Sequence, residues 1–179
     1  PMKIPRSILQ IIQKFEKNGF ECYVVGGSVR DNLLHRKISD FDLCTNALPE
    51  QTMVLFDHTI PTGIKHGTIT IVIDGQFVEV TTFRKEGEYT DHRHPDQVRF
   101  VKDLRSDLAR RDLTINAMAY SPKLGYIDPF GGMEDLKKKL IKTVGDPEKR
   151  FEEDALRMVR AHRFAAVLGF SIDESTQKA

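Results

Sequence analysis

The stretch 22–44, CYVVGGSVRDNLLHRKISDFDLC, decides the fold because it predicts two short strands separated by a turn and a helix. Its first four residues form an apolar run that predicts a strand ending at Gly26-Gly27. A helix is predicted over about 28–34, with Ser28 as its cap. The stretch therefore predicts a strand–turn–helix–strand unit.

The second strand of this unit, predicted to include 41–44, contains Asp40 and Asp42. Because side chains alternate along a strand, both carboxylates share one face, while Phe41 and Leu43 occupy the other. Mg²⁺ prefers oxygen ligands, typically one or two carboxylates together with substrate phosphates. The pair predicts a magnesium site, although two aspartates at this spacing also occur on ordinary surface strands.

The flanking sequence predicts a mixture of helices and strands up to about residue 130. Apolar residues at helical spacing over 8–15 predict an amphipathic helix, and Asp74-Gly75 between two β-rich runs predicts a hairpin over 68–82. Further predicted elements are helices over 49–56, 103–111, 133–140 and 147–168, extended segments over 116–120 and 126–128, and a mobile loop over 84–95. We expect an α+β part over 1–130 and the start of an all-α part over 131–179.

The composition excludes several classes of protein. The 27 basic and 26 acidic side chains of the 179 residues give a net charge of +1, so any basic surface is local. Cys22 and Cys44 are too few for a disulfide framework or a cysteine-rich zinc site. No apolar run approaches the roughly 18–20 residues that span a bilayer, and no signal-peptide pattern is present. We expect a cytoplasmic protein without membrane contact, and a fragment of a longer chain.

The glycine turn is a candidate phosphate site. Gly26 and Gly27 lie between a strand and a helix, where backbone amides can receive a phosphate, and Arg30 follows one turn later. An ordinary tight turn with a solvated arginine is the alternative. Glu79, within the predicted hairpin, is either a third carboxylate near the metal or the outward side of an edge strand.

A second cluster of polar residues consists of Arg110-Arg111-Asp112 and Asn116. Two cations, an acid and an amide within seven residues suit a triphosphate clamp with ribose contacts. The alternative is a charged helix end.

The long helix predicted over 147–168 carries charged residues at every third position, namely Asp154, Arg157, Arg160 and Arg163. At about 100° per residue, residues three positions apart are separated by about 60° around the helix axis. Consecutive members of this series therefore lie next to each other on the helix surface. Apolar residues occupy much of the remaining circumference, which predicts burial on several sides. A buried arginine needs a partner, which a phosphate or base edge supplies, and ion pairs with Glu152 and Glu153 are the structural alternative.

Five motifs follow one another along the chain: VGGSVRD at 25–31, DFDL at 40–43, RRDLTINA at 110–117, DPFGG at 128–132 and EDALR at 153–157. In this order they resemble the motifs of the class II tRNA nucleotidyltransferases, the CCA-adding enzymes, of the DNA polymerase β-like superfamily. The resemblance covers nearly the whole chain. It implies a nucleotidyltransferase head with a mixed sheet flanked by helices, followed by a helical neck that recognises the incoming base.

The resemblance also implies roles for the candidate residues. Asp40 and Asp42 bind Mg²⁺ and are catalytic. The residues implied to contact the nucleotide are Gly27, Arg30 and Arg111, with Asp112 and Asn116 at the ribose and Asp154, Arg157, Arg160 and Arg163 around the base.

The implied substrates are CTP, ATP and the 3′ end of tRNA. Cytosine and adenine both present an amine donor beside a ring-nitrogen acceptor, whereas uracil and guanine present the reverse. Asp154 beside Arg157 therefore offers an acceptor and a donor that match C and A. With U or G, acceptor would face acceptor and donor would face donor, and such unpaired buried polar groups are strongly penalised. We expect two Mg²⁺ ions, one lowering the pKa of the tRNA 3′-hydroxyl and one binding the triphosphate, so that no protein general base is required.

Related activities stay open beside CCA addition. Bacterial poly(A) polymerases share most of the motifs, although TGIKHGT at 62–68 resembles the CCA-adding version. An enzyme that adds only A is a further alternative, whereas CC-only enzymes resemble the family with a shortened 84–95 segment. A non-catalytic nucleotide-sensing module is the alternative outside the enzymes, and the retention of both Asp40 and Asp42 argues against it.

Two features depart from the family pattern. His35 stands where the family commonly has glycine, which predicts a local difference in that turn. The resemblance implies that the tRNA-binding body and tail domains lie outside this sequence, so we do not expect this chain alone to bind tRNA independently. The resemblance is also compatible with a homodimer of the full-length protein.

Overall fold

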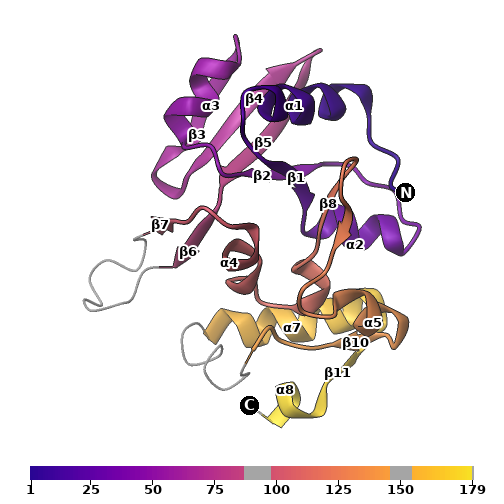
Figure 1. Cartoon of the computed structure of the whole chain (residues 1–179). Coiled ribbons are helices and arrows are strands. Elements are labelled where there is room, and N and C mark those ends of the chain that lie inside the picture. The colour runs from indigo at the N-terminus through magenta and orange to yellow at the C-terminus, as the bar shows by residue number, and fades with distance from the viewer. Residues whose placement is uncertain (87–97, 146–154, 179) are drawn as a thin grey trace.

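The computed structural model of the chain describes residues 1–86, 98–145 and 155–178. Its centre is a seven-stranded sheet in the order β3-β4-β5-β2-β1-β8-β9 (Figure 1). The strands are β1 (Cys22–Val25), β2 (Asp42–Thr45), β3 (Thr59–Gly63), β4 (Thr68–Ile73), β5 (Gln76–Thr82), β8 (Ala119–Ser121) and β9 (Gly125–Ile127). Strands β2 and β5 run parallel, and the other neighbours are antiparallel. The mixed sheet confirms the predicted α+β class.

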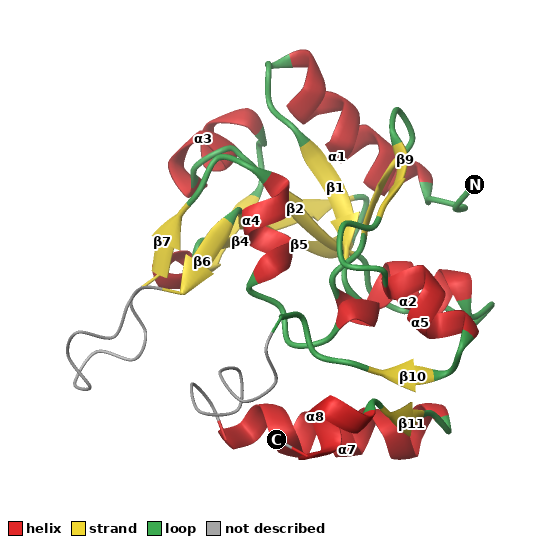
Figure 2. Ribbon diagram, turned by 60° about the horizontal axis from the view of Figure 1, so that its bottom comes forward, coloured by secondary structure: helices red, strands yellow, loops and turns green. Residues whose placement is uncertain are grey.

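Helices and two small ladders surround this sheet. The helices are α1 (Arg6–Lys17), α2 (Gly27–Leu33), α3 (Pro49–Leu55), α4 (Leu104–Ala109), α5 (Gly132–Lys137), α7 (Ala155–Leu168) and α8 (Glu174–Lys178), with 3-10 turns η1 (Ile64–His66) and η2 (Thr114–Asn116). The ladders pair β6 (Arg84–Glu86) with β7 (Val98–Phe100) and β10 (Leu140–Ile141) with β11 (Ser171–Ile172). Figures 1 and 2 show α5, α7, α8 and β10 together on one side, away from α1 and α3. Within the described ranges, we find no helix with the length and apolarity needed to span a membrane.

Two apolar cores bury both faces of the central strands. Val24 of β1 belongs to the core that α1 covers, whereas the next residue, Val25, belongs to the core that contains Leu108 of α4. All four residues of β1 are buried for this reason. A strand covered on both faces, as β1 is, carries apolar side chains throughout, so its neighbouring polar residues lie beyond its ends. The chemistry of the protein is therefore expected where the central strands begin or end.

Two left-handed turns bear on the sequence predictions. Asp74 and Gly75 have positive φ angles of 49° and 74°, as a two-residue hairpin turn requires, and they join β4 to β5. The predicted hairpin is confirmed. His35 also has a positive φ, 58°, a conformation that favours glycine. The chain thus keeps a left-handed residue at the position where the resembling family commonly has glycine.

Near the sheet, one prediction is wrong and one strand was missed. Helix α2 begins at Gly27 and its N-cap is Gly26, so Ser28 is not the cap, and its hydroxyl instead donates to the Val25 carbonyl at 3.2 Å. Strand β3 was not predicted, because its largely exposed sequence TIPTG lacks apolar alternation. Its pairing with β4 at the sheet edge makes it a strand, and an edge position also tolerates Pro61.

Later element boundaries also differ from the predictions. Residues 116–120 are not one extended segment, because η2 ends at Asn116 and β8 begins at Ala119. The helix predicted over 133–140 ends at Lys137, since Leu140 pairs with Ser171 in the β10–β11 ladder. Of the predicted long helix, 155–168 is helical, while 147–154 lies outside the described residues. The predicted loop over 84–95 is wrong at 84–86, which pair with β7 as strand β6, and its 87–95 part lies outside the described residues.

Candidate active site

The predicted catalytic carboxylates lie at one end of the central strands. Asp42 is the first residue of β2 and pairs in register with Val25 of β1 and Glu79 of β5. Asp40 precedes the strand, so the prediction that both aspartates lie within it is wrong. The side chains of Asp40, Asp42 and Glu79 are exposed. Because the glycine turn follows Val25 directly, strand register brings the acidic residues next to that turn.

The charge around Asp42 suits a cation. Desolvation raises the pKa of its carboxyl above the ordinary 3.8, the charge of Glu79 raises it further, Arg111 lowers it, and Asp40 raises it. A carboxylate held against like charges is stabilised by a bound cation, and oxygen donors suit Mg²⁺. Among the described residues, no three acidic, histidine or cysteine side chains are grouped closely enough to hold a metal alone. Asp40 and Asp42 therefore fit an ion that takes its remaining ligands from phosphates and water.

Two arginines approach the glycine turn from different elements. Gly26 has a φ of 74°, and its amide donates to the Met118 carbonyl at 3.1 Å. A Cβ on Gly26 would lie 3.4 Å from Arg111 Nη1, and one on Gly27 would lie 3.2 Å from Arg30 Nη2. The positive φ disfavours a side chain at Gly26, and the Arg111 guanidinium lies within contact distance of the turn. The turn and the two cations form a site suited to a triphosphate.

Arg30 is not the solvated arginine of the alternative interpretation. Its Nη1 donates to Asn116 Oδ1 at 2.6 Å, and its Nε pairs with Asp31 Oδ1 at 3.1 Å. Its Cζ also lies 5.1 Å from the centre of the Phe164 ring in α7. Asn116, predicted at the ribose, thus orients Arg30 in this structure.

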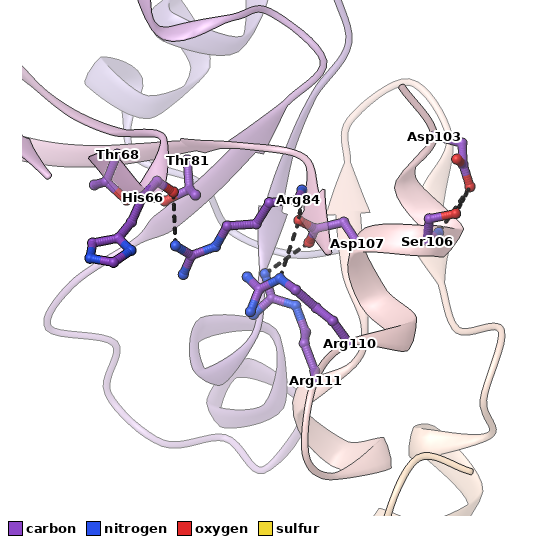
Figure 3. Close-up of polar contacts among 9 residues, drawn as sticks. All are labelled: His66, Thr68, Thr81, Arg84, Asp103, Ser106, Asp107, Arg110 and Arg111. Carbon is purple, nitrogen blue, oxygen red and sulfur yellow. Dashed lines mark hydrogen bonds and ion pairs between the residues drawn. The ribbon is translucent and has the colours of Figure 1, made fainter. Parts of the chain in front are cut away.

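Arg111 is held by an aspartate that the sequence interpretation missed. Asp107 of α4 is fully buried, and its Oδ1 accepts a hydrogen bond from Arg111 Nη2 at 3.1 Å (Figure 3). Its Oδ2 accepts from the Arg84 backbone amide at 2.9 Å and lies 3.6 Å from Arg110 Nε. The spacing of Asp107 to Arg110 and Arg111, three and four residues along a helix, is the signal that could have revealed this cluster.

The Arg84 side chain extends the same network toward the sheet. Its Nη1 donates to the His66 carbonyl at 2.8 Å (Figure 3). Arg84 therefore joins the turn η1 to Asp107, while Arg111 joins Asp107 to the glycine turn. Asp107 is the junction between these two connections.

The predicted base-recognition residues are only partly described. Arg160 Nη1 pairs with Asp112 Oδ2 at 3.3 Å, which occupies the carboxylate predicted at the ribose. Arg163 is exposed, the side chain of Arg157 is not described, and Asp154 lies outside the described residues. The structure therefore brings Arg160 to the head and leaves the pairing of Asp154 with Arg157 a prediction.

Helix α7 packs by one face in this chain. Ala161 is buried and Phe164 and Leu168 pack against the main core, but Val159 and Val167 are 61% and 63% exposed. The predicted burial on several sides is therefore wrong for the described part of the helix.

Comparison with known proteins assigns the chain to a family. A sequence profile of the Poly A polymerase head domain matches residues 22–142. The chain belongs to the Poly A polymerase head domain family. CCA-adding enzymes of Anoxybacillus flavithermus and Geobacillus sp. (strain WCH70) are 52% and 53% identical to it over 97% and 99% of its length. The chain covers 44% of each, and so spans less than half the length of these relatives.

Solved structures of family relatives agree with the fold. The Bacillus stearothermophilus CCA-adding enzyme in complex with CTP matches with a TM-score of 0.90 at 48% identity, covering 99% of this chain and 43% of that one. A tRNA nucleotidyltransferase complexed with a primer tRNA and an incoming ATP analog matches with a TM-score of 0.74 at 34% identity, over 94% and 48%. Nucleotidyltransferases of this kind generally use a divalent metal.

One motif shared with the resembling family has a structural role here. Asp128 accepts hydrogen bonds from the amides of Gly132 and Met133, at 2.7 and 2.9 Å, at the start of α5. A Cβ on Gly132 would collide with the Thr114 carbonyl of η2. The DPFGG motif thus fixes α5 against the turn that carries Asn116.

Proposed function

We propose that the protein adds C, C and A to the 3′ end of tRNA from CTP and ATP, without a nucleic-acid template and in the cytoplasm. The observation that carries the proposal is the register of β1, β2 and β5, which gathers Asp42, Glu79 and the glycine turn beside Arg111. The likeness to CCA-adding enzymes, one of them in complex with CTP, supports it.

In the proposed reaction the chain binds a triphosphate and exposes it to the tRNA end. Arg30, Arg111 and the amides of the glycine turn bind the phosphates. Asp40 and Asp42 would hold Mg²⁺, which when bound neutralises phosphate charge and activates the attacking hydroxyl. The tRNA 3′-oxygen forms a bond to the α-phosphorus while the bond to pyrophosphate breaks, and the hydroxyl proton passes to water. Asp107 holds Arg111 in place without touching substrate.

Nucleotide choice is assigned to α7 and the residues before it. Asp154 and Arg157 together offer an acceptor and donors that match the amine and ring nitrogen of both C and A. Arg160 and Arg163 are placed along the same helix, and Arg160 contacts the head through Asp112. We assign catalysis to 1–130 and base recognition to 131–179, and we propose a homodimer as the assembly of the complete protein.

Polyadenylation is the second candidate. The family to which the chain belongs takes its description from poly(A) polymerases, and their substrate ATP would fit the same clamp. An enzyme that adds only the terminal A has the same chemistry. The acidic pair beside a phosphate turn counts against a module that only senses nucleotides, because such a module needs no metal.

One incubation series separates these activities. The complete protein is supplied with tRNAs ending before CCA, after C, and after CC, and each NTP is given separately with Mg²⁺ or with EDTA. We expect C on the first two substrates, A on the third, and no addition in EDTA. Long A tails indicate a poly(A) polymerase, and addition to the third substrate alone indicates an A-only enzyme. Nucleotide binding without any addition would contradict the proposal and favour the sensor.

A further inference from the structure

We infer that Phe164 is a positioning residue whose ring holds the Arg30 guanidinium at the glycine turn and thereby couples α7 to triphosphate binding. The inference rests on the proposed function, since it takes Arg30 as a triphosphate ligand. Phe164 itself touches no substrate. It acts through Arg30 alone.

Contacts from three elements fix the Arg30 guanidinium. Nη1 donates to Asn116 of η2 at 2.6 Å, and Nε pairs with Asp31 of α2 at 3.1 Å. The Phe164 ring of α7 lies 5.1 Å from Cζ. The Nη2 group is the one next to Gly27, 3.2 Å from where a Cβ would stand. Two nitrogens therefore serve to orient the group, and the third lies beside Gly27 of the glycine turn, where a phosphate is predicted to bind.

The ring is a fixed support because Phe164 is partly buried and packs against the main apolar core. A guanidinium within about 6 Å of an aromatic centroid is attracted to the ring face. An arginine side chain that is already ordered loses less rotamer freedom when it binds an anion, so it binds more tightly. Replacing the ring removes this ordering while the hydrogen bonds to Asp31 and Asn116 persist.

This contact gives α7 an influence on the phosphate end of the nucleotide. The same helix carries Arg157 and Arg160, which the proposed function assigns to the base. A base that binds to α7 and fixes the position of the helix also fixes the Phe164 ring against Arg30. Phosphate affinity and base recognition are then coupled through one side chain.

Nucleotide affinity tests the inference in the complete protein. Phe164→Leu is expected to raise the Kd for CTP about two- to tenfold, the range for ordering one charged side chain. Phe164→Tyr, which keeps an aromatic face, is expected to restore the affinity. Phe170→Leu is the matched control, because Phe170 packs against the same core and its ring has no cation over it among the described residues.

Fluorination separates the ring's charge distribution from its packing. Phenylalanine at position 164 is replaced by mono-, di- and trifluorophenylalanine, which weaken the negative face of the ring with little change of shape. We expect the Kd for CTP to rise stepwise with each fluorine, while the unfolding midpoint stays constant. The NMR signal of the Arg30 Nε–H should shift in the same series without nucleotide.

The outcomes are distinct. If the wild-type protein binds CTP and the Kd does not change across the fluorine series, Phe164 only fills space. That result would overturn this inference and leave the proposed function standing. An equal loss of affinity in Phe170→Leu would overturn it too. A wild-type protein that binds no CTP would overturn the proposed function and this inference with it.

Discussion

The acidic end of the central strands and helix α7 are assigned to the same nucleotide, but different forces place them. Asp42 and Glu79 are fixed by backbone ladders between β1, β2 and β5, with a buried core on both faces of the sheet. In the part of the chain that the structure describes, helix α7 meets charged site residues through side-chain contacts that include Arg30–Phe164 and Asp112–Arg160. The proposed chemistry is therefore placed on residues that backbone pairing fixes, and the proposed recognition on side-chain contacts that sequence changes can tune separately.

The largest effect is expected from removing the charge of Asp42 at the acidic end of the central strands. Asp42→Asn is expected to lower turnover in the complete protein on the order of a thousandfold or more, because a metal ligand worth several kcal/mol is lost. CTP binding should persist, since Arg30 and Arg111 are untouched. Asp74→Asn, at the exposed hairpin turn, is the control and should retain full turnover. Comparable activity of Asp42→Asn and wild type would remove the metal assignment.

The second test concerns the junction that supports Arg111. Asp107→Asn removes the carboxylate that pairs with Arg111 and Arg110, and is expected to cost about 3 kcal/mol of unfolding free energy in urea titrations. It should also raise the KM for CTP, because Arg111 is no longer held at the glycine turn. Asp103→Asn on the same helix is the control, since asparagine caps a helix as well as aspartate. Equal stability of the two variants would show that Asp107 is not a junction.

The third test addresses recognition without chemistry. Asp154→Ala is expected to reduce the preference for CTP and ATP over UTP and GTP on the order of a hundredfold, because the acceptor that penalises U and G is gone. Single-turnover addition of each NTP measures this ratio. Glu174→Ala, an exposed acid in α8, should leave it unchanged. An unaltered ratio in Asp154→Ala would place nucleotide choice outside the long helix.

The smallest effect is a stability change at the acidic end without metal. The folded-state pKa of Asp42 is raised, so its ionised form opposes folding above that pKa, and the folded chain gains stability as pH falls through it. In EDTA at neutral pH, Asp42→Asn should therefore be slightly more stable than wild type, within about 1 kcal/mol for an exposed group. Thermal unfolding between neutral pH and pH 4 should show this advantage shrinking with acid. A destabilised Asp42→Asn protein would contradict the desolvation and like-charge repulsion around Asp42.

Sequence reasoning succeeded where the signal is local. The hairpin follows from Asp74-Gly75, because two left-handed residues define its turn. Helix α1 follows from apolar spacing. The motifs predicted Asp40, Asp42, Arg30 and Arg111 as one site, and that assignment stays a prediction. It failed at β3, which lacks apolar alternation, and at Ser28, because the glycine turn starts the helix before the serine, at Gly26.

By itself, the sequence determined the fold class, the family resemblance and the chemical types present, because periodicity and motif order are properties of neighbouring residues. Only the tertiary structure decided which groups meet: Glu79 beside Asp42, Phe164 under Arg30, and Asp107 behind Arg111. Two of these contacts join positions far apart along the chain, and they depend on sheet register and helix docking. The contact between Asp107 and Arg111 is local in sequence, and only the structure shows that Asp107 is buried. A buried carboxylate must be paired, so it fixes the arginines around it.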